Sequence, residues 1–234
     1  MIKLAAFDLD DTLAKIGKGI THTDLALLGQ IEDEGVRVAV VSGKPAFYLC
    51  GFMRQVEIKD PILIGENGGV IEFGVDVPPA FFYMLDYKKE AKEAIDIFRR
   101  EISEKLPEIW FQPNRIGLTP FPSKIEDFDI IQKILDENRD LLEYVDIYRH
   151  IDCFDITPKG INKYKGLEKL TELLDITREE TAVVGNGVND YPMFEFAGYS
   201  IGINIPDNSK VSHNVATSYG ALSHLLGVIR AQRS

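Results

Sequence analysis

The chain begins with an alternation of buried-strand and amphipathic-helix patterns. An apolar run at 4–9 is followed by a stretch at 24–34 with apolar residues at helical spacing, and then by a β-branched run at 36–41. Similar apolar runs lie at 62–64, 181–184 and 200–203, and Gly68-Gly69 predicts a hairpin through 70–73. Helix patterns recur near residue 45 and over 167–174, 193–194 and 222–229. Strands that are apolar throughout are typical of a parallel sheet covered on both faces. The pattern therefore predicts an α/β, doubly wound, Rossmann-like core.

The middle of the chain follows a different pattern. Helix-like spacing over 88–106 precedes short strand patterns at 109–112 and 116–119, and a second helix over 128–142 precedes strands at 145–148 and 154–157. This αββαββ order, without long apolar runs, predicts a small α+β unit inserted into the core. Prolines at 78–79 and the segment at 158–160 mark the junctions. We therefore expect a core formed by 1–81 and 156–234, with an insert at 82–155.

The charge balance argues against two classes of partner. The 234 residues include 26 basic and 37 acidic side chains, which gives a formal net charge of −11. Such acidity disfavours nucleic acid and anionic membranes, and no apolar run approaches the ~20 residues of a membrane span. The two cysteines, Cys50 and Cys153, have the spacing of neither a disulfide framework nor a zinc site. We therefore expect a cytoplasmic globular protein, a monomer or homodimer, with a small-molecule partner.

Polar residues with related chemistry follow the predicted core strands. The segments are Asp8-Leu9-Asp10-Asp11-Thr12 after the first strand, Ser42-Gly43-Lys44 after the second, Gly185-Asn186-Gly187-Val188-Asn189-Asp190 after the strand at 181–184, and Lys163 before a helix. Because ligands bind at the carboxyl ends of strands in open α/β sheets, we expect these residues to meet at one edge. Carboxylates, a hydroxyl, an amine and glycines there suit Mg²⁺ and a phosphate group.

These residue types suggest a division of roles in phosphoryl transfer. Asp8 and Asp190 are expected to hold Mg²⁺, which prefers oxygen ligands and retains several waters. Asp8 can also act as a nucleophile and form an aspartyl-phosphate, while Ser42 and Lys163 stabilise charge on the phosphoryl oxygens. Asp10 is then expected to carry the proton, first to the leaving alcohol and later from the attacking water.

Each segment also has a purely structural interpretation. The residues after the first strand can cap a helix, Ser42-Gly43 can form a turn, and Gly185-Asn186-Gly187 can form a loop with left-handed residues. Lys163 alone is typical of a solvated helix lysine. The functional interpretation is favoured by the order of the four segments, each at the end of a buried strand or at the start of a helix.

In this order the segments resemble the motifs of the haloacid dehalogenase-like (HAD) phosphatase superfamily. Asp8-Leu9-Asp10-Asp11-Thr12-Leu13 resembles the first motif, Ser42-Gly43 the second, Lys163 the third and Gly185–Asp190 the fourth. Glu66-Asn67-Gly68-Gly69 and Asp155-Ile156-Thr157-Pro158-Lys159-Gly160 are similar to segments of the branch that contains Cof-type, sucrose and archaeal phosphoglycolate phosphatases. The resemblance covers the whole chain and implies an α/β cap between the second and third motifs.

The resemblance implies a role for each motif residue. Asp8 is implied to be the nucleophile, and Asp10 the general acid/base that also reaches the metal through its backbone carbonyl. The implied phosphate ligands are Ser42, Gly43 and Lys163, and the implied magnesium site contains Asp190 and, at a position where the branch usually has aspartate, Asn186. An amide offers one oxygen and no charge, so we expect weaker metal binding than in an all-carboxylate site.

The lysine motif also departs from the usual pattern of the branch. Lys163 is followed by Tyr164 where the branch has glycine, and Lys165-Gly166 comes two residues later. Lys165 is therefore the alternative phosphate ligand if the register is shifted.

Four further residues are candidates for substrate binding. Lys44 and Asn189 adjoin the second and fourth motifs, and Arg115 and Arg149 lie in the predicted insert. A solvated surface is the alternative interpretation of the two arginines. The four histidines have no metal-ligand spacing, and only His150 is a candidate for a cleft between insert and core.

The sequence thus predicts a Mg²⁺-dependent phosphatase, a phosphoric monoester hydrolase, for a small metabolite such as a sugar phosphate or a phosphoglycolate-like compound. A phosphomutase or phosphotransferase of the phosphomannomutase type is the alternative, because it shares the chemistry. A non-enzymatic phosphoacceptor switch, similar to a response-regulator receiver, is a third possibility, although receivers have about half this length and no inserted unit. The substrate stays open, because specificity would lie in side chains of the insert.

Overall fold

The computed structural model describes residues 1–233 as two compact units. The first unit joins Met1–Met84 to the chain from Asn162 onward, and the second comprises Leu85–Ile161. The expected insert at 82–155 begins inside strand β5 (Phe81–Met84) and ends inside strand β9 (Phe154–Pro158). Strand pairing accounts for the difference, because β5 pairs with the sheet of the first unit, whereas β9 forms a hairpin with β8 (Val145–Arg149) in the second.

The first unit is built on one large sheet. Within residues 1–233 this sheet has eight strands, in the order β12-β11-β10-β1-β2-β3-β4-β5. The strands not yet bounded are β1 (Leu4–Phe7), β2 (Arg37–Val41), β3 (Ile62–Gly65), β4 (Val70–Phe73), β10 (Thr181–Gly185), β11 (Tyr199–Ile203) and β12 (His213–Val215). The strands from β12 to β3 are parallel, and β4 and β5 are added antiparallel. The central strands are buried along almost their whole length, as predicted from their apolar runs.

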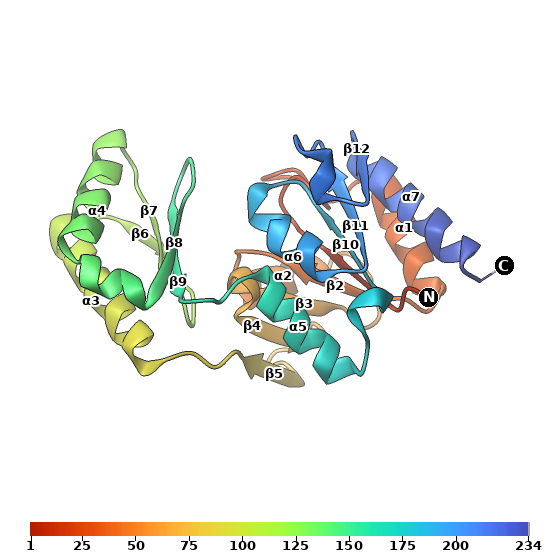
Figure 1. The fold of residues 1–234 in the computed structure, drawn as a ribbon, viewed down its shortest axis with the longest axis horizontal. Helices are drawn as coiled ribbons and strands as arrows, with labels where there is room; N and C mark the ends of the chain where they lie inside the picture. The colour runs from red at the N-terminus through yellow and green to blue at the C-terminus, as the bar shows by residue number, and fades with distance from the viewer. Residues whose placement is uncertain (234) are drawn as a thin grey trace. The chain divides into compact units, whose positions relative to one another are not determined.

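Helices cover both faces of this sheet (Figure 1). Helices α1 (His22–Asp33), α2 (Ala46–Met53) and α7 (Ser218–Ala231) pack on one face, against alternate strand residues such as Phe7, Val38 and Val184. Helices α5 (Lys163–Leu174) and α6 (Tyr191–Phe196) lie on the other face. The doubly wound α/β core is therefore confirmed. Of the helices in residues 1–233, none is both long and apolar enough to cross a membrane.

Two strands of the large sheet were not predicted. In β5, half-buried and exposed side chains alternate, and β12 has only three residues, none of them fully buried. Each lies at an edge of the sheet, where a strand has one neighbour and incomplete burial. The apolar pattern that identifies buried strands is weak at such positions.

The second unit has the predicted αββαββ order. Its elements are α3 (Lys89–Lys105), β6 (Trp110–Gln112), β7 (Thr119–Phe121), α4 (Ile125–Glu137), β8 and β9. The strand predicted at 116–119 lies at 119–121, because only the later residues pair with β6. Helices α3 and α4 cover one face of the strands, around a core that includes Phe98, Ile131 and Phe154 (Figure 1). Polar residues alternate with these core residues along the strands and occupy the opposite face.

Candidate active site

The ends of β1, β2 and β10 bring the first, second and fourth motifs to one edge of the sheet. In the parallel register, Phe7 lies beside Val40 of β2 and Val184 of β10. Asp8 and Ser42 directly follow these paired segments, and both are buried. Their neighbourhood follows from register alone, as expected for the carboxyl ends of parallel strands.

A lysine lies between two buried carboxylates at this edge. The Nζ atom of Lys163 is 2.6 Å from Oδ1 of Asp8 and 2.6 Å from Oδ1 of Asp190, and the three side chains are 1%, 7% and 0% exposed. Lys163 begins α5, and Asp190 ends a short 3₁₀ turn, η4 (Val188–Asp190). Lys165 instead pairs with Glu168 at an exposed position of α5. The structure therefore places Lys163, and not Lys165, beside the carboxylates.

Close backbone packing brings Lys163 to this position. Gly68 ends the 3₁₀ turn η1 (Glu66–Gly68), has a φ of 106°, and lies so near the start of α5 that a Cβ would collide with the carbonyl group of Asn162. A Cβ on Gly166 would come within 2.6 Å of the Gly68 Cα atom. The two glycines thus allow α5 to approach the sheet, because neither has a side chain.

The loop before Asp190 fixes its carboxylate. Its Oδ2 atom accepts hydrogen bonds from the backbone N–H of Asn186, at 2.8 Å, and of Gly187, at 2.9 Å. The side chain also packs on Gly185, where a Cβ would lie 2.6 Å from Oδ2. Position 185 therefore requires glycine if Asp190 is to keep its place.

Burial and charge both shift the ionisation of this cluster. Burial raises the pKa of Asp8 to about 7; Asp190 and Asp10 add to the rise, and Lys163 opposes it. Burial by itself lowers the pKa of Lys163, but the Asp190 and Asp8 carboxylates outweigh it, so this pKa lies above its usual value. Lys163 is therefore a cation at neutral pH, and its single positive charge faces two buried carboxyl groups.

Comparison with known proteins identifies the family. A sequence profile of haloacid dehalogenase-like hydrolases matches residues 5–78 and 80–210. The chain belongs to this family. It is 29% identical over 222 residues to a phosphoglycolate phosphatase of Thermoplasma volcanium, which covers 94% of this chain and 93% of the relative. It is 23% identical over 224 residues to an HMP-PP phosphatase of Yersinia pseudotuberculosis, which covers 85% and 82%.

A solved structure shows the same fold. The crystal structure of a haloacid dehalogenase-like hydrolase from Bacteroides thetaiotaomicron matches with a TM-score of 0.80 at 17% identity, over 96% of this chain and 100% of that chain. Family membership and the phosphatases among the relatives confirm the expected class of enzyme, a phosphoric monoester hydrolase.

In this HAD-like hydrolase, Asp10 lies in a more open environment than Asp8. The Asp10 side chain is 30% exposed, and its Oδ2 atom is 3.6 Å from Nζ of Lys44. The backbone N–H of Lys44 in turn donates to Oγ of Ser42, at 3.2 Å. The first and second motifs are thus in contact, and half-buried Gly43 lies between the two contacting residues.

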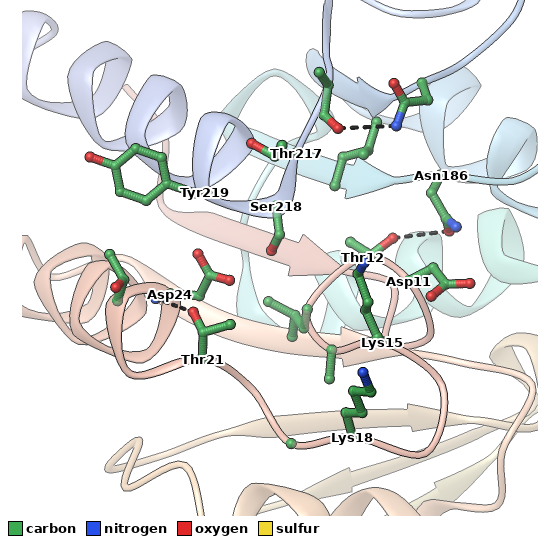
Figure 2. A pocket seen from close by; sticks show the side chains of 17 residues that line it. Asp11, Thr12, Lys15, Lys18, Thr21, Asp24, Asn186, Thr217, Ser218 and Tyr219 are labelled. Atoms are coloured by element: carbon green, nitrogen blue, oxygen red, sulfur yellow. Dashed lines mark hydrogen bonds between the residues drawn. The ribbon is translucent and has the colours of Figure 1, made fainter.

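Asn186 connects the fourth motif to the first. Its Oδ1 atom accepts a hydrogen bond from Oγ1 of Thr12, at 3.0 Å. Both side chains line a cavity of about 720 Å³ beside the segment 11–24 and the start of α7 (Figure 2). Asp8, Lys163 and Asp190 do not line this cavity, but Asn186 does, and its backbone N–H donates to the Asp190 carboxylate. The sequence predicted that the two segments meet at one edge of the sheet, but it did not identify this pair of side chains, which depends on their orientation in the loops.

The remaining candidates lie at exposed positions. Asn189 is exposed on η4, and Arg115 is exposed in the loop between β6 and β7. The guanidinium of Arg149 lies over the rings of Phe128, at 5.1 Å, and Phe154, at 5.6 Å. Because both rings belong to the core beneath α3 and α4, Arg149 extends toward the helix side of the second unit's strands.

Proposed function

We propose that this hydrolase is a Mg²⁺-dependent phosphatase that cleaves a small phosphorylated metabolite through an aspartyl-phosphate on Asp8. The observation that carries the proposal is the buried contact of Lys163 with Asp8 and Asp190 at the end of the central strand. A nucleophile, a fixed cation and a second carboxylate in this arrangement suit phosphoryl transfer, which depends on positioning and on stabilisation of charge.

Asp8 supplies the nucleophile. A carboxylate oxygen of Asp8 attacks phosphorus, the bond from phosphorus to the alcohol oxygen breaks, and the phosphoryl group is left on Asp8. The Lys163 ammonium and the Ser42 hydroxyl donate to the phosphoryl oxygens, together with the backbone N–H of Gly43. These donors are in place before the reaction, because Lys163 and Ser42 are held by buried contacts.

Asp10 carries the proton in both steps. It protonates the departing alcohol oxygen, and it then accepts a proton from the water that attacks the phosphorus of the Asp8 phosphate. This second step returns free Asp8 and inorganic phosphate. The different surroundings of the two carboxyl groups support different roles, since Asp8 is buried whereas Asp10 is 30% exposed.

The residues of the cluster fit a hard divalent cation. Asp8 and Asp190 offer carboxylate oxygens, the Asp10 backbone offers a carbonyl, and Asn186 offers one amide oxygen. The two buried carboxyl groups exceed the single positive charge of Lys163, which favours a cation. When bound, Mg²⁺ neutralises charge on the phosphoryl group and on the carboxylates.

We further propose that the second unit is a cap that selects the leaving group. The strand face away from α3 and α4 carries buried polar side chains, including Gln112, Thr119 and Asp155, which can recognise a polar metabolite. The similarity to phosphoglycolate and HMP-PP phosphatases supports a small phosphorylated substrate. Arg115, Lys44 and Asn189 remain candidates for contact with it.

A substrate panel tests the proposal. Phosphoglycolate, phosphoglycerate, hexose phosphates and nucleotides are incubated with the full chain, once with Mg²⁺ and once with excess chelator, and released phosphate is measured. We expect Mg²⁺-dependent release from at least one compound. Isomer interconversion that depends on a sugar bisphosphate, with little release, would instead indicate a phosphomutase. No turnover of any kind, with a stable phosphoryl group on the protein, would indicate a phosphoacceptor switch.

A further inference from the structure

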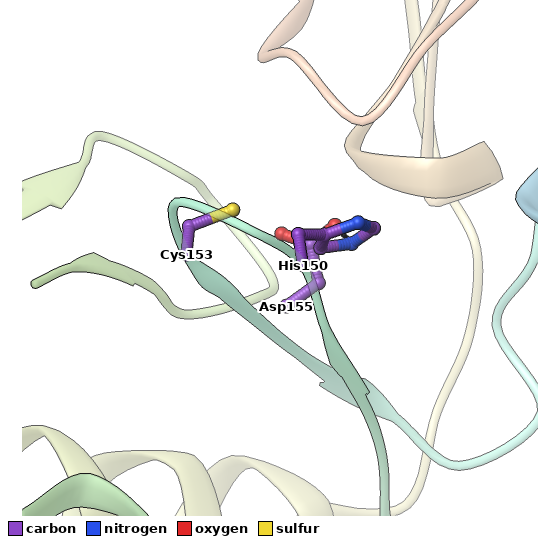
Figure 3. Close-up of side chains that lie close together, drawn as sticks. All are labelled: His150, Cys153 and Asp155. Carbon is purple, nitrogen blue, oxygen red and sulfur yellow. Dashed lines mark hydrogen bonds and ion pairs between the residues drawn. The ribbon is translucent and has the colours of Figure 1, made fainter. Parts of the chain in front are cut away.

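The turn between β8 and β9 brings three potential metal ligands together (Figure 3). The donor atoms of His150, Cys153 and Asp155 all lie within 4.8 Å of one another. The backbone N–H of His150 donates to the carbonyl oxygen of Cys153, at 2.8 Å, which closes the turn. The Nε2 atom of His150 is 3.2 Å from Oδ2 of Asp155. Cys153 and Asp155 are buried, and the His150 side chain is 35% exposed.

A chain of hydrogen bonds fixes the Asp155 carboxylate. Its Oδ1 atom accepts from Oγ1 of Thr119, at 2.8 Å, and that hydroxyl accepts from Nδ2 of Asn114, at 2.9 Å. Oδ1 of Asn114 accepts in turn from Nε2 of Gln112, at 2.8 Å. Because Oδ1 of Asp155 is bonded to Thr119, Oδ2 is the carboxylate oxygen that faces His150. Hydrogen bonds that orient a ligating carboxylate in this way are typical of metal sites.

The distances fit a tetrahedral ion of zinc size. Nitrogen and oxygen ligands about 2.0–2.2 Å from a tetrahedral zinc lie about 3.4 Å from each other. The distance of 3.2 Å between His150 Nε2 and Asp155 Oδ2 is close to this value. A thiolate sulfur about 2.3 Å from the same ion lies about 3.6 Å from the nitrogen or oxygen ligand, so the Sγ atom of Cys153 needs to approach by about 1.2 Å at most. Imidazole, thiolate and carboxylate together favour Zn²⁺ over Mg²⁺, which prefers oxygen ligands alone.

We propose that His150, Cys153 and Asp155 form a second metal site, which binds one borderline-soft divalent ion such as Zn²⁺. Binding replaces the thiol proton of Cys153, which is released to solvent, and leaves a fourth position for water. All three ligands come from one hairpin of the second unit. The site is therefore distinct in ligand chemistry from the oxygen-rich cluster at Asp8.

Cobalt provides the test, because a thiolate bound to Co²⁺ has its own absorption. The full chain is freed of metal with a chelator and titrated with Co²⁺. We expect one equivalent to produce a thiolate-to-cobalt charge-transfer band and visible bands of tetrahedral Co²⁺, which Zn²⁺ removes and excess Mg²⁺ does not. Co²⁺ at the Asp8 cluster has only oxygen ligands and gives no thiolate band. Absence of this band in the wild-type chain would overturn the proposal without any variant.

Two cysteine variants identify the ligand. Cys153→Ser should remove the band and weaken Zn²⁺ binding at least tenfold, whereas Cys50→Ser, which changes the buried thiol of the first unit, should leave both unchanged. Circular dichroism confirms that each variant is folded. Unchanged Zn²⁺ affinity in Cys153→Ser, or loss of the band in Cys50→Ser alone, would refute the assignment.

A third variant tests whether the hydrogen bond from Thr119 to the Asp155 carboxylate contributes to metal binding. Thr119→Val removes the hydrogen bond to Asp155 and should weaken Zn²⁺ binding about ten- to a hundredfold while the thiolate band persists. A Zn²⁺ affinity in Thr119→Val equal to that of the wild type would contradict a metal held through Asp155.

Discussion

The two polar clusters of this hydrolase are assembled in opposite ways. Asp8, Lys163 and Asp190 are 155 and 27 residues apart in sequence, and they meet because parallel strands and α5 end at one edge of a sheet. His150, Cys153 and Asp155 lie within six residues and meet because a hairpin turns between them. The first cluster depends on the whole fold of its unit, whereas the second depends mainly on local register.

This difference has energetic consequences. The first cluster buries more acidic groups than basic ones, so it keeps stored electrostatic free energy that the rest of the unit must offset. In the second cluster, a hydrogen bond from Thr119 of β7 stabilises the Asp155 carboxylate, and the His150 side chain is partly exposed to solvent. Substitutions in the first cluster should therefore affect both activity and stability, whereas those in the second should change metal binding with a smaller loss of stability.

The largest expected effect is that of Asp8→Asn. An amide is a poor nucleophile, so kcat should fall by about a thousandfold or more while the fold is retained. Initial rates of phosphate release measure the change. The matched control is Asp11→Asn, the same chemical change at an exposed position three residues later, which should keep most of the activity. Substantial turnover by Asp8→Asn would exclude the covalent route.

Lys163→Met should be the most destabilising change in the first cluster. It leaves two buried carboxyl groups without their cation, and loss of one partner of a buried ion pair costs about 3–5 kcal/mol. Loss of Lys163 raises the pKa of Asp8 further, so urea unfolding measured with chelator should show a loss of stability that grows as the pH rises and the buried carboxyl groups ionise. Lys165→Met, which removes an exposed ion pair, should cost less than about 1 kcal/mol. Equal losses for the two variants would contradict the buried cluster.

Gly185→Ala should reduce activity about tenfold or more, because the added Cβ displaces the Asp190 side chain. The control is Gly51→Ala in α2, where a Cβ meets no atom within 4 Å and the helix propensity improves. Phosphate release and thermal unfolding of both variants measure the effects. An active Gly185→Ala variant with unchanged Mg²⁺ dependence would show that the position of Asp190 is not critical.

Asn186→Asp should lower the half-saturating Mg²⁺ concentration several-fold, because a carboxylate adds charge at the metal site while still accepting the bond from Thr12. Mg²⁺ titrations of activity compare it with Asn189→Asp, which adds the same charge at an exposed position of η4. If Asn186→Asp requires as much Mg²⁺ as the wild type, or if Asn189→Asp lowers the requirement equally, the expectation of a weak metal site at Asn186 is wrong.

The smallest effects are expected for the two arginines of the second unit. Arg115→Ala should change the ranking of substrates more than the hydrolysis of a generic aryl phosphate. Arg149→Ala should mainly lose its contacts with two aromatic rings, which costs about 0.5–1 kcal/mol. Substrate panels and unfolding curves separate the two outcomes. A proportional loss on every substrate would place either arginine in the phosphoryl machinery.

The parts that could be predicted from sequence are those with a strong local pattern. The strands beside Asp8 are almost entirely apolar, and the first, second and fourth motifs directly follow strands of this kind. The edge strand β5 was missed because half of its side chains are exposed. The choice between Lys163 and Lys165 stayed open in the sequence, because it depends on the contact of Gly166 with Gly68, about a hundred residues away in the chain.

Motif patterns in the sequence did not identify the grouping of His150, Cys153 and Asp155. Their spacing matches no common metal motif, so the sequence analysis found no metal-ligand pattern among the histidines and cysteines. The grouping follows from the register of β8 with β9, in which Arg149 lies opposite Phe154. In a hairpin the register is fixed by the type and length of the turn, which the sequence pattern at 149–154 does not reveal.

The most direct test of the central claim is a search for the phosphoryl group on Asp8. The wild-type chain is mixed with Mg²⁺ and an active substrate, quenched in acid during the first turnover, digested and analysed by mass spectrometry. The account predicts one phosphoryl group on the peptide that contains Asp8, and none in the Asp8→Asn variant. Rapid phosphate release with no phosphorylated peptide at any quench time, or with the phosphoryl group on another residue, would contradict it.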